Sequence, residues 1–379
     1  MRTGVRLVPA FGMLLASSGV AALVSAQGPP VRNVPEGVSC ASCRIVVTPR
    51  RTLQRGGDAD VIGIPLAVRR DRAGRYWLMQ WMSAPRLFDS TGSFLRTIGR
   101  RGAGPGEYSN PIDAVELPGD SMLIVDDHAV RATVLDPKLE PIRQVVLPGS
   151  GQLRPGAIPE WPTALIVNVW ETDWRRPVGP IRRLTLAGPR AAIAESFGAE
   201  GRPLSPDEDP EGYVVARAGP DRLWSTQSAL YRLSLWSMRG QKLTTLERRA
   251  PWFPPPPTSG MGSPTMPPSP RIRTMYQDAD GLLWVFITVA SPRWREYWPP
   301  APPRGRGGEL GERASSVEAT ERLYVTRVEV LDPAAGRVVA RTDLDFWVID
   351  AAAGQQLAIY RVDANDEPLV TIADFALRR

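Results

Sequence analysis

One unit recurs along this chain and limits its fold more than any other feature of the sequence. Each copy begins with turn-forming residues, enters a short apolar stretch that often contains Trp, and continues into one or two further apolar stretches. The equivalent positions lie 47, 42, 58, 60 and 74 residues apart, at Trp77, Ile124, Ile166, Trp224, Trp284 and Ala358. A four-stranded propeller blade takes about 40–50 residues, so the first two intervals each fit one blade. Six units closed into a ring would also remove the exposed sheet edges of an open all-β chain.

The three longer intervals contain inserts. Residues 197–212 are rich in Pro and acidic side chains, residues 251–270 in Pro, and residues 292–316 in Pro, Gly and Arg. The chain has 39 Pro and 34 Gly among 379 residues, which argues against an all-helical protein because both residues interrupt helices. We therefore predict an all-β, six-bladed β-propeller with Pro-rich loop inserts, in which the strand tryptophans pack between blades.

A strand-like stretch that ends at Leu53 precedes the first repeat and has no partner of its own. We predict that it pairs within the blade that contains the C-terminal strand and so closes the ring. Residues 44–379 would then form a single propeller domain.

The segment from Phe88 to Tyr108 carries the most specific motif. It resembles the repeat of NHL-type six-bladed β-propellers, a pattern shared by many exported bacterial propeller proteins, with an architecture similar to NHL and TolB propellers. The resemblance implies that its last part forms the tight connection to the next blade, with the residues Gly102, Gly104, Pro105, Gly106, Glu107 and Tyr108. A phosphate-binding loop is excluded, because neither Lys nor Ser/Thr follows in the required position.

The first 26 residues are typical of a secretory signal peptide. Arg2 and Arg6 precede an apolar run from Leu7 to Val24, and small residues precede a cleavage site that we place after Ala26. An uncleaved membrane anchor is the alternative. Cleavage predicts a secreted or periplasmic protein with no integral membrane domain, and we expect a monomer.

Residues 27–43 form an N-terminal extension that ends in the two cysteines of the chain, Cys40 and Cys43. In an oxidising compartment a local disulfide is the expected state of such a pair. A redox-active pair is the alternative, but it needs its first Cys at a helix start, whereas the residues after Cys43 have the pattern of a strand.

Charge and composition narrow the range of partners and cofactors. The formal net charge is +6, from 46 Lys and Arg against 40 Asp and Glu, with a single His. The Arg residues are expected to form a solvated surface, and we predict no nucleic-acid partner, since the sequence has no dense basic face with interleaved aromatic residues. A single imidazole excludes most catalytic zinc centres, and we predict no cofactor and no metal site.

Two features could nevertheless support catalysis. NHL-type propellers are similar to lactonase-type propellers, which hold a divalent cation with oxygen ligands. By this resemblance, the candidate acids here are Glu107, Asp113, Asp126, Asp127 and Glu171. His128 follows two of these acids directly, but a blade-end turn with an exposed His is the simpler explanation of that cluster.

Aromatic residues in the inserts and in the third unit have no obvious role in the blades. Together with neighbouring Arg they could form a ligand-binding rim, made of Trp170, Trp174, Trp252, Arg293, Trp294, Arg295, Tyr297 and Trp298. Alternatively, they cover their own loops against the propeller. We predict a non-catalytic binding or scaffolding module for a protein or a carbohydrate-like ligand; the alternative is a metal-dependent hydrolase or lactonase.

Overall fold

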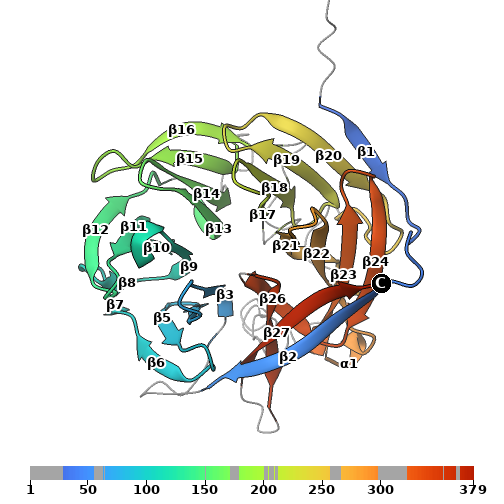
Figure 1. Ribbon diagram of the computed structural model, residues 1–379, viewed down its shortest axis with the longest axis horizontal. Coiled ribbons are helices and arrows are strands. Elements are labelled where there is room, and N and C mark those ends of the chain that lie inside the picture. Colours follow the sequence, from blue (N-terminus) through green and yellow to red (C-terminus); the bar gives the residue numbers. More distant parts are fainter. Residues whose placement is uncertain are drawn as a thin grey trace, which may run out of the picture.

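The computed structural model describes residues 29–54, 63, 65–149, 151–170, 179–199, 204, 209, 212–256, 266–297, 322–352, 354–363 and 368–379. These residues form six small sheets arranged in a ring around a central axis (Figure 1). The six-bladed β-propeller predicted from the repeat is therefore confirmed. The predicted signal peptide, residues 1–26, lies outside the described residues.

Each blade consists of four antiparallel strands, and the chain passes from the inner edge of a blade to its outer edge. Blade 1 contains β3 (Pro65–Arg70), β4 (Tyr76–Gln80), β5 (Ser83–Phe88) and β6 (Phe94–Thr97). Blade 2 contains β9 (Pro111–Glu116), β10 (Met122–Asp126), β11 (Arg131–Leu135) and β12 (Pro141–Val146). Blade 3 contains β13 (Gln152–Glu160), β14 (Ala164–Trp170), β15 (Ile181–Thr185) and β16 (Ala192–Phe197).

The other three blades follow the same plan. Blade 4 contains β17 (Tyr213–Arg217), β18 (Arg222–Gln227), β19 (Arg232–Ser237) and β20 (Lys242–Arg248). Blade 5 contains β21 (Arg271–Gln277), β22 (Leu283–Ala290), β23 (Tyr324–Asp332) and β24 (Arg337–Leu344). Blade 6 contains β25 (Trp347–Ala352), β26 (Gln356–Val362) and β27 (Pro368–Arg378), and its outer strand is β2 (Arg44–Leu53).

The ring closes through the pairing of β2 with β27. The two strands are antiparallel over almost their whole length, from Arg44 opposite Arg378 to Leu53 opposite Val370. The predicted pairing of the N-terminal strand with the C-terminal blade is thus what the structure contains. The inner strands β3, β9, β13, β17, β21 and β25 each contact the next around the axis, and β25 contacts β3 again.

The residues before β2 run along the outer edges of two further blades (Figure 1). β1 (Val31–Val34) adds to blade 4 as a fifth strand, parallel to β20. The chain then passes blade 5, where the Ser39 N–H donates to the Val338 carbonyl over 2.8 Å. A disulfide joins Cys40 and Cys43 just before β2 begins. We refer to residues 29–43 as the strap.

The repeated turn and strand sequence has a specific structural basis. In blade 1 the carboxylate of Asp71 accepts hydrogen bonds from the Arg75 amide (2.8 Å) and from the indole Nε1 of Trp77 (3.0 Å). In blade 5 the carboxylate of Asp278 likewise accepts hydrogen bonds from the Leu282 amide and from Trp284 Nε1, both at 2.9 Å. Both turns have a Gly at φ +81°, a conformation that favours glycine.

The six equivalent positions of the repeat all fall in the second strand of a blade and are at most 1% exposed. The side chains of these strands pack against those of neighbouring blades, so the core consists of a series of apolar clusters around the ring. The prediction that the strand tryptophans pack in the core is confirmed for Trp77, Trp224 and Trp284.

The motif that resembles the NHL repeat connects blade 1 to blade 2. In the last part of the motif, two short strands, β7 (Arg100–Arg101) and β8 (Glu107–Tyr108), pair as a parallel ribbon. Glu107 closes the loop, because its carboxylate accepts hydrogen bonds from the Gly104 amide and from Arg100 Nε, both at 2.7 Å. The backbone approaches so closely that a Cβ on Gly99 would lie 2.0 Å from the Gly106 carbonyl oxygen.

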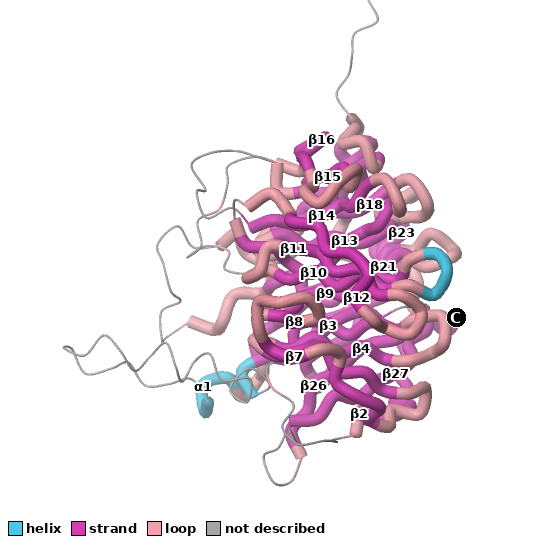
Figure 2. Tube along the Cα trace, turned by 90° about the vertical axis from the view of Figure 1, so that its left-hand side faces the viewer, coloured by secondary structure: helices cyan, strands magenta, loops and turns pink. Residues whose placement is uncertain are grey.

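The two faces of the ring differ in their connections. Strands alternate in direction, so the links between second and third strands and those between blades emerge on one face. All three predicted inserts start there: residues 197–212 follow β16, residues 251–270 follow β20, and residues 292–316 follow β22. Short turns such as residues 71–75 and 278–282 form the opposite face (Figure 2). We call these the insert face and the turn face.

Helix is scarce in the described part of the chain. The short helix α1 (Trp294–Tyr297) begins the third insert, and a single 3-10 turn, η1 (Pro118–Asp120), precedes β10. Among the described residues, no helix combines the length and apolar character needed to cross a bilayer.

Candidate functional site

The central channel is divided into two chambers by a polar waist. On the insert side, a chamber of about 150 Å³ is lined by the first halves of inner strands from five blades. On the turn side, a chamber of about 630 Å³ is lined by the second halves of all six inner strands. The residues common to both chambers define the waist and are Arg69, Gly156, Val215, Thr274 and Asp350.

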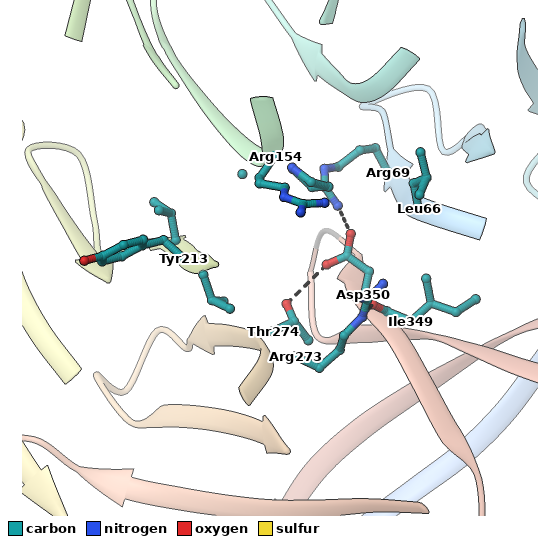
Figure 3. Close-up of a pocket in the computed structure, with 12 residues that line it drawn as sticks. Leu66, Arg69, Arg154, Tyr213, Arg273, Thr274, Ile349 and Asp350 are labelled. Atoms are coloured by element: carbon teal, nitrogen blue, oxygen red, sulfur yellow. Dashed lines mark hydrogen bonds and ion pairs between the residues drawn. The ribbon is translucent and has the colours of Figure 1, made fainter. Parts of the chain in front are cut away.

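Arg69 is the centre of the waist (Figure 3). Its Nε lies 2.8 Å from Asp113 Oδ1, and its Nη1 pairs with Asp350, whose other oxygen accepts a hydrogen bond from Thr274 at 3.2 Å. The second oxygen of Asp113 accepts from the Gly156 amide at 2.8 Å. Burial opposes the charge on Arg69, but the two carboxylates outweigh it and hold its pKa above the usual value. These contacts join inner strands of five blades, so we assign the waist a structural role.

The insert-side chamber gathers polar and aromatic side chains from blades 3 and 4. The guanidinium of Arg154 lies over the ring of Trp170, 4.7 Å from its centroid, and Arg154 lines the chamber. Tyr213 of the adjacent blade 4 also lines it, but its ring points away from Arg69 and Asp350 (Figure 3), and its hydroxyl accepts a hydrogen bond from Gln227 Nε2 at 2.7 Å. Asn168 Nδ2 donates to the Tyr213 carbonyl, also at 2.7 Å. Of the predicted rim residues, Trp170 is therefore next to the channel mouth.

The other predicted rim residues that the structure describes do not line this chamber. Trp252 is held in a cluster between blades 4 and 5, where Arg327 lies 4.4 Å from its ring centroid and Tyr231 packs edge to face against it. Its Nε1 donates to Glu36 of the strap at 3.3 Å. Trp252 therefore lies against the blades and the strap.

The helix α1 holds three predicted rim residues, Trp294, Arg295 and Tyr297, and Arg293 directly precedes it. Trp294 is only 8% exposed, and Arg295 lies over its ring at 5.2 Å. Arg293 donates to Glu296 at 2.6 Å and to the Tyr297 hydroxyl at 2.7 Å on the exposed side. Trp174 and Trp298 lie outside the described residues, so the rim as a whole stays a prediction.

An aromatic pair that the sequence analysis did not single out is exposed on the insert face. Trp81, in the link between β4 and β5, is 48% exposed. Its ring packs edge to face against His128, from the corresponding link of blade 2, with centroids 5.7 Å apart. The sequence signal was a second Trp directly after a strand whose core position is already occupied by Trp77.

The acids proposed as cation ligands that the structure describes are engaged in other contacts. Asp126 accepts from the Ser109 amide at 2.7 Å and from the Ala129 amide at 2.9 Å, while Asp127 accepts from the Leu153 amide at 2.5 Å. Burial raises the pKa of Asp127 above its usual value, although this hydrogen bond opposes the shift. Within the described residues, no group of three or more His, Cys, Asp or Glu side chains could hold a metal ion. Glu171 lies outside them.

Comparison with known proteins supports the fold more than the function. No family model matches the chain. Its sequence is 35% identical to 2-C-methyl-D-erythritol 4-phosphate cytidylyltransferase of Bordetella pertussis over 102 residues, which are 27% of this chain. The chain thus spans 38% of the length of that curated relative, too little to assign its family or activity.

Solved structures match the whole ring. A member of the DUF4221 family from Bacteroides vulgatus aligns with a TM-score of 0.55 and 11% identity, over 89% of this chain and 97% of the other. A protein of Bacteroides fragilis described as exported aligns with a TM-score of 0.56 and 8% identity, over 91% and 99%. At these identities the likeness concerns the fold alone. The chain is a six-bladed β-propeller similar in fold to these Bacteroides proteins, as its NHL-like repeat predicts.

Proposed function

We propose that the protein is exported and acts as a non-catalytic binding or scaffolding module, which holds a protein or a carbohydrate-like ligand on its insert face. Export is supported by the signal-peptide pattern of residues 1–26 and by the similar fold of a Bacteroides fragilis protein described as exported. Binding residues are found disproportionately on loops that a rigid scaffold positions, and here the longer links gather on one face.

The observation that carries the proposal is the exposed pair of Trp81 and His128 on that face. A large aromatic side chain costs little to expose singly, but Trp is enriched among the residues that dominate binding energies. The pair comes from two adjacent blades and is held edge to face, so its geometry is set before a ligand arrives. Trp170 and Arg154 extend the same face toward the channel mouth.

The test is a comparison of ligand capture by the exported protein and by the double variant Trp81→Ala, His128→Ala. An oligosaccharide array and mass spectrometry of co-purifying proteins would both be applied. We expect the variant to lose at least about tenfold in binding, the usual effect of removing a central aromatic contact. The control variant Ile142→Ser removes a side chain that is 62% exposed on the outer edge of blade 2, and it should bind normally. Equal capture by wild type and double variant would refute the site.

Elemental analysis distinguishes this proposal from a metal-dependent hydrolase or lactonase. The protein would be purified without chelator and assayed for bound Ca and Zn. Stoichiometric metal together with metal-dependent turnover of a lactone would overturn the non-catalytic assignment.

A further inference from the structure

The turn-side chamber is not used by the proposed function, and every residue that lines it is described. Its volume of about 630 Å³ is in the range of sites that hold small molecules. All six inner strands contribute, and the surrounding links, such as residues 71–75 and 117–121, are short turns. The chamber is therefore part of the rigid ring.

The walls of the chamber are mainly apolar. The small side chains of Ala157, Ala351 and Ala352 leave the space open. Larger apolar side chains of the lining include Met122, Ile158 and Met275. An apolar body that enters the chamber would lose contact with water on most sides, which is favourable by roughly 25 cal/mol for each Å² buried.

The inner strands also offer backbone hydrogen-bonding groups. Each is paired with a neighbour on one side only, so its other edge faces the channel axis. Two groups on such an edge already act across the gap between blades, because the Gly156 and Ala157 amides donate to Asp113 at 2.8 and 2.9 Å. A polar group of a ligand could be fixed in the same manner.

The acidic residues of the lining are already paired with arginines. Asp350 pairs with Arg69 at the waist. The carboxylate of Glu116 accepts the amide of Arg72 at 3.0 Å and lies 3.5 Å from Arg72 Nε. Neither acid is therefore a free negative charge at the chamber.

Two arginines at the end of the chamber have no acidic partner among the described residues. Arg217 donates to the carbonyls of Gly219 and Pro220, at 3.0 and 3.2 Å. Arg70 lies over the ring of Tyr76, 5.8 Å from its centroid. Both end their inner strands on the turn face and line the chamber, and neither is paired with an acid of the lining.

We propose that the turn-side chamber binds a small organic anion, with the apolar body of the ligand between the inner strands and its acidic group near Arg217. The site would be separate from the insert face, since the waist, which includes the ion pair of Arg69 and Asp350, lies between the two chambers. A protein of this kind would therefore have a small-molecule site on one face and a larger ligand on the other.

The test uses two fluorescent probes of similar shape, the anionic anilinonaphthalene sulfonate and the uncharged phenylnaphthylamine. Each is titrated into the folded protein, and the rise in fluorescence gives its Kd. Arg217 is exposed, so Arg217→Gln should fold normally. We expect this variant to bind the anionic probe roughly three- to tenfold more weakly and the neutral probe as before.

Two further variants test the location of the site. Ala157→Phe and Ala351→Phe enlarge half-buried side chains on opposite sides of the ring, in blades 3 and 6, and each should weaken both probes by more than tenfold. Circular dichroism confirms that the variants are folded. Ile142→Ser and Trp81→Ala are the controls and should bind both probes as the wild type does.

Three results would overturn the proposal. Unchanged probe binding in folded Ala157→Phe and Ala351→Phe proteins would show that the probes bind elsewhere. An equal effect of Arg217→Gln on both probes, or no effect on either, would refute the preference for anions. Loss of probe binding in Trp81→Ala would place the probe site on the insert face.

Discussion

The buried carboxylate of Glu329 shows how single residues hold neighbouring blades together. It is fully buried on β23 of blade 5 and accepts hydrogen bonds from Arg341 of the same blade at 2.6 Å. Across the interface it accepts from Arg248 at 2.7 and 2.8 Å and from the Tyr231 hydroxyl at 2.6 Å. Burial and the nearby carboxylate raise the pKa of Tyr231, so its hydroxyl remains a hydrogen-bond donor.

We expect Glu329→Gln to lower the free energy of unfolding by about 3–5 kcal/mol, because Arg248 would be left as a buried charge without its main partner. Urea unfolding measures the change. The matched control is Asp343→Asn, which breaks a two-bond ion pair between Arg327 and a half-exposed acid and should cost no more than about 1 kcal/mol. Equal losses in the two variants would contradict a special role for the buried carboxylate.

Tyr108, the last residue of the NHL-like motif, is predicted to make stability depend on alkaline pH. Its side chain is 1% exposed, and its buried hydroxyl has no hydrogen-bond partner among the described residues. Burial raises its pKa to about 12 from an ordinary value of 10. The unfolded chain therefore releases this proton first, so the contribution is intact below pH 10 and is lost as the pH rises toward 12.

The variant Tyr108→Phe should leave stability at pH 7 within about 1 kcal/mol of wild type, since the lost hydroxyl makes no hydrogen bond. At pH 11 the wild type should lose about 1.4 kcal/mol through this group, and the variant should not. The difference between their urea midpoints at the two pH values gives the result. Other buried tyrosines titrate in both proteins and cancel, so parallel pH profiles would show that Tyr108 has no part.

At the scale of elements, the closing strands β2 and β27 are expected to contribute more to the stability of the fold than the strap does. β27 pairs with β26 on one side and with β2 on the other, and it buries Val370, Ile372 and Phe375. β1 pairs with β20 alone, and three of its four residues are exposed.

Deletion of residues 369–379 should therefore abolish cooperative thermal unfolding. The free energy lost with two strand pairings and these buried side chains should be larger than the stability of about 5–15 kcal/mol that a folded domain has. Deletion of residues 29–34 should lower Tm by only a few degrees. Circular dichroism melts compare the two. An unchanged melting curve after the C-terminal deletion would refute closure through β2.

Some elements could be predicted because their sequence signal is local, and β1 could not because it has no local signal. The second strands of the blades combine a turn, an apolar run and often a Trp within ten residues, and all six lie where the repeat predicts. β1 has no such pattern, since its exposed side chains and its pairing with β20 more than two hundred residues away leave no local trace. The sequence analysis therefore includes it only in the N-terminal extension, residues 27–43, with no strand assigned.

At the scale of the whole molecule, the ring could be predicted but the contents of its channel could not. The repeat length, the NHL-like motif and the orphan strand at Leu53 were enough to infer six blades and their closure. The ion pairs of Arg69 connect blade 1 with Asp113 of blade 2 and with Asp350 of blade 6. The contact of Trp81 with His128 connects a link of blade 1 with a link of blade 2. These residues lie in different blades, and Arg69 meets Asp350 only when the ring has closed, so the local sequence carries no sign of the contacts.

The closure described above also fixes the order in which the chain can complete its fold. β2 is among the first strands to be made, yet its partner β27 is the last. At synthesis rates of about 5–20 residues per second, roughly 20–60 s separate the two. Until β27 is made, the β2 segment lacks its partner, and its Pro49, Arg50 and Arg51 are residues of the kind that keep unpaired strands from pairing with other chains. The sequence of β2 is therefore suited both to pairing with β27 and to avoiding contacts with other chains before β27 is available.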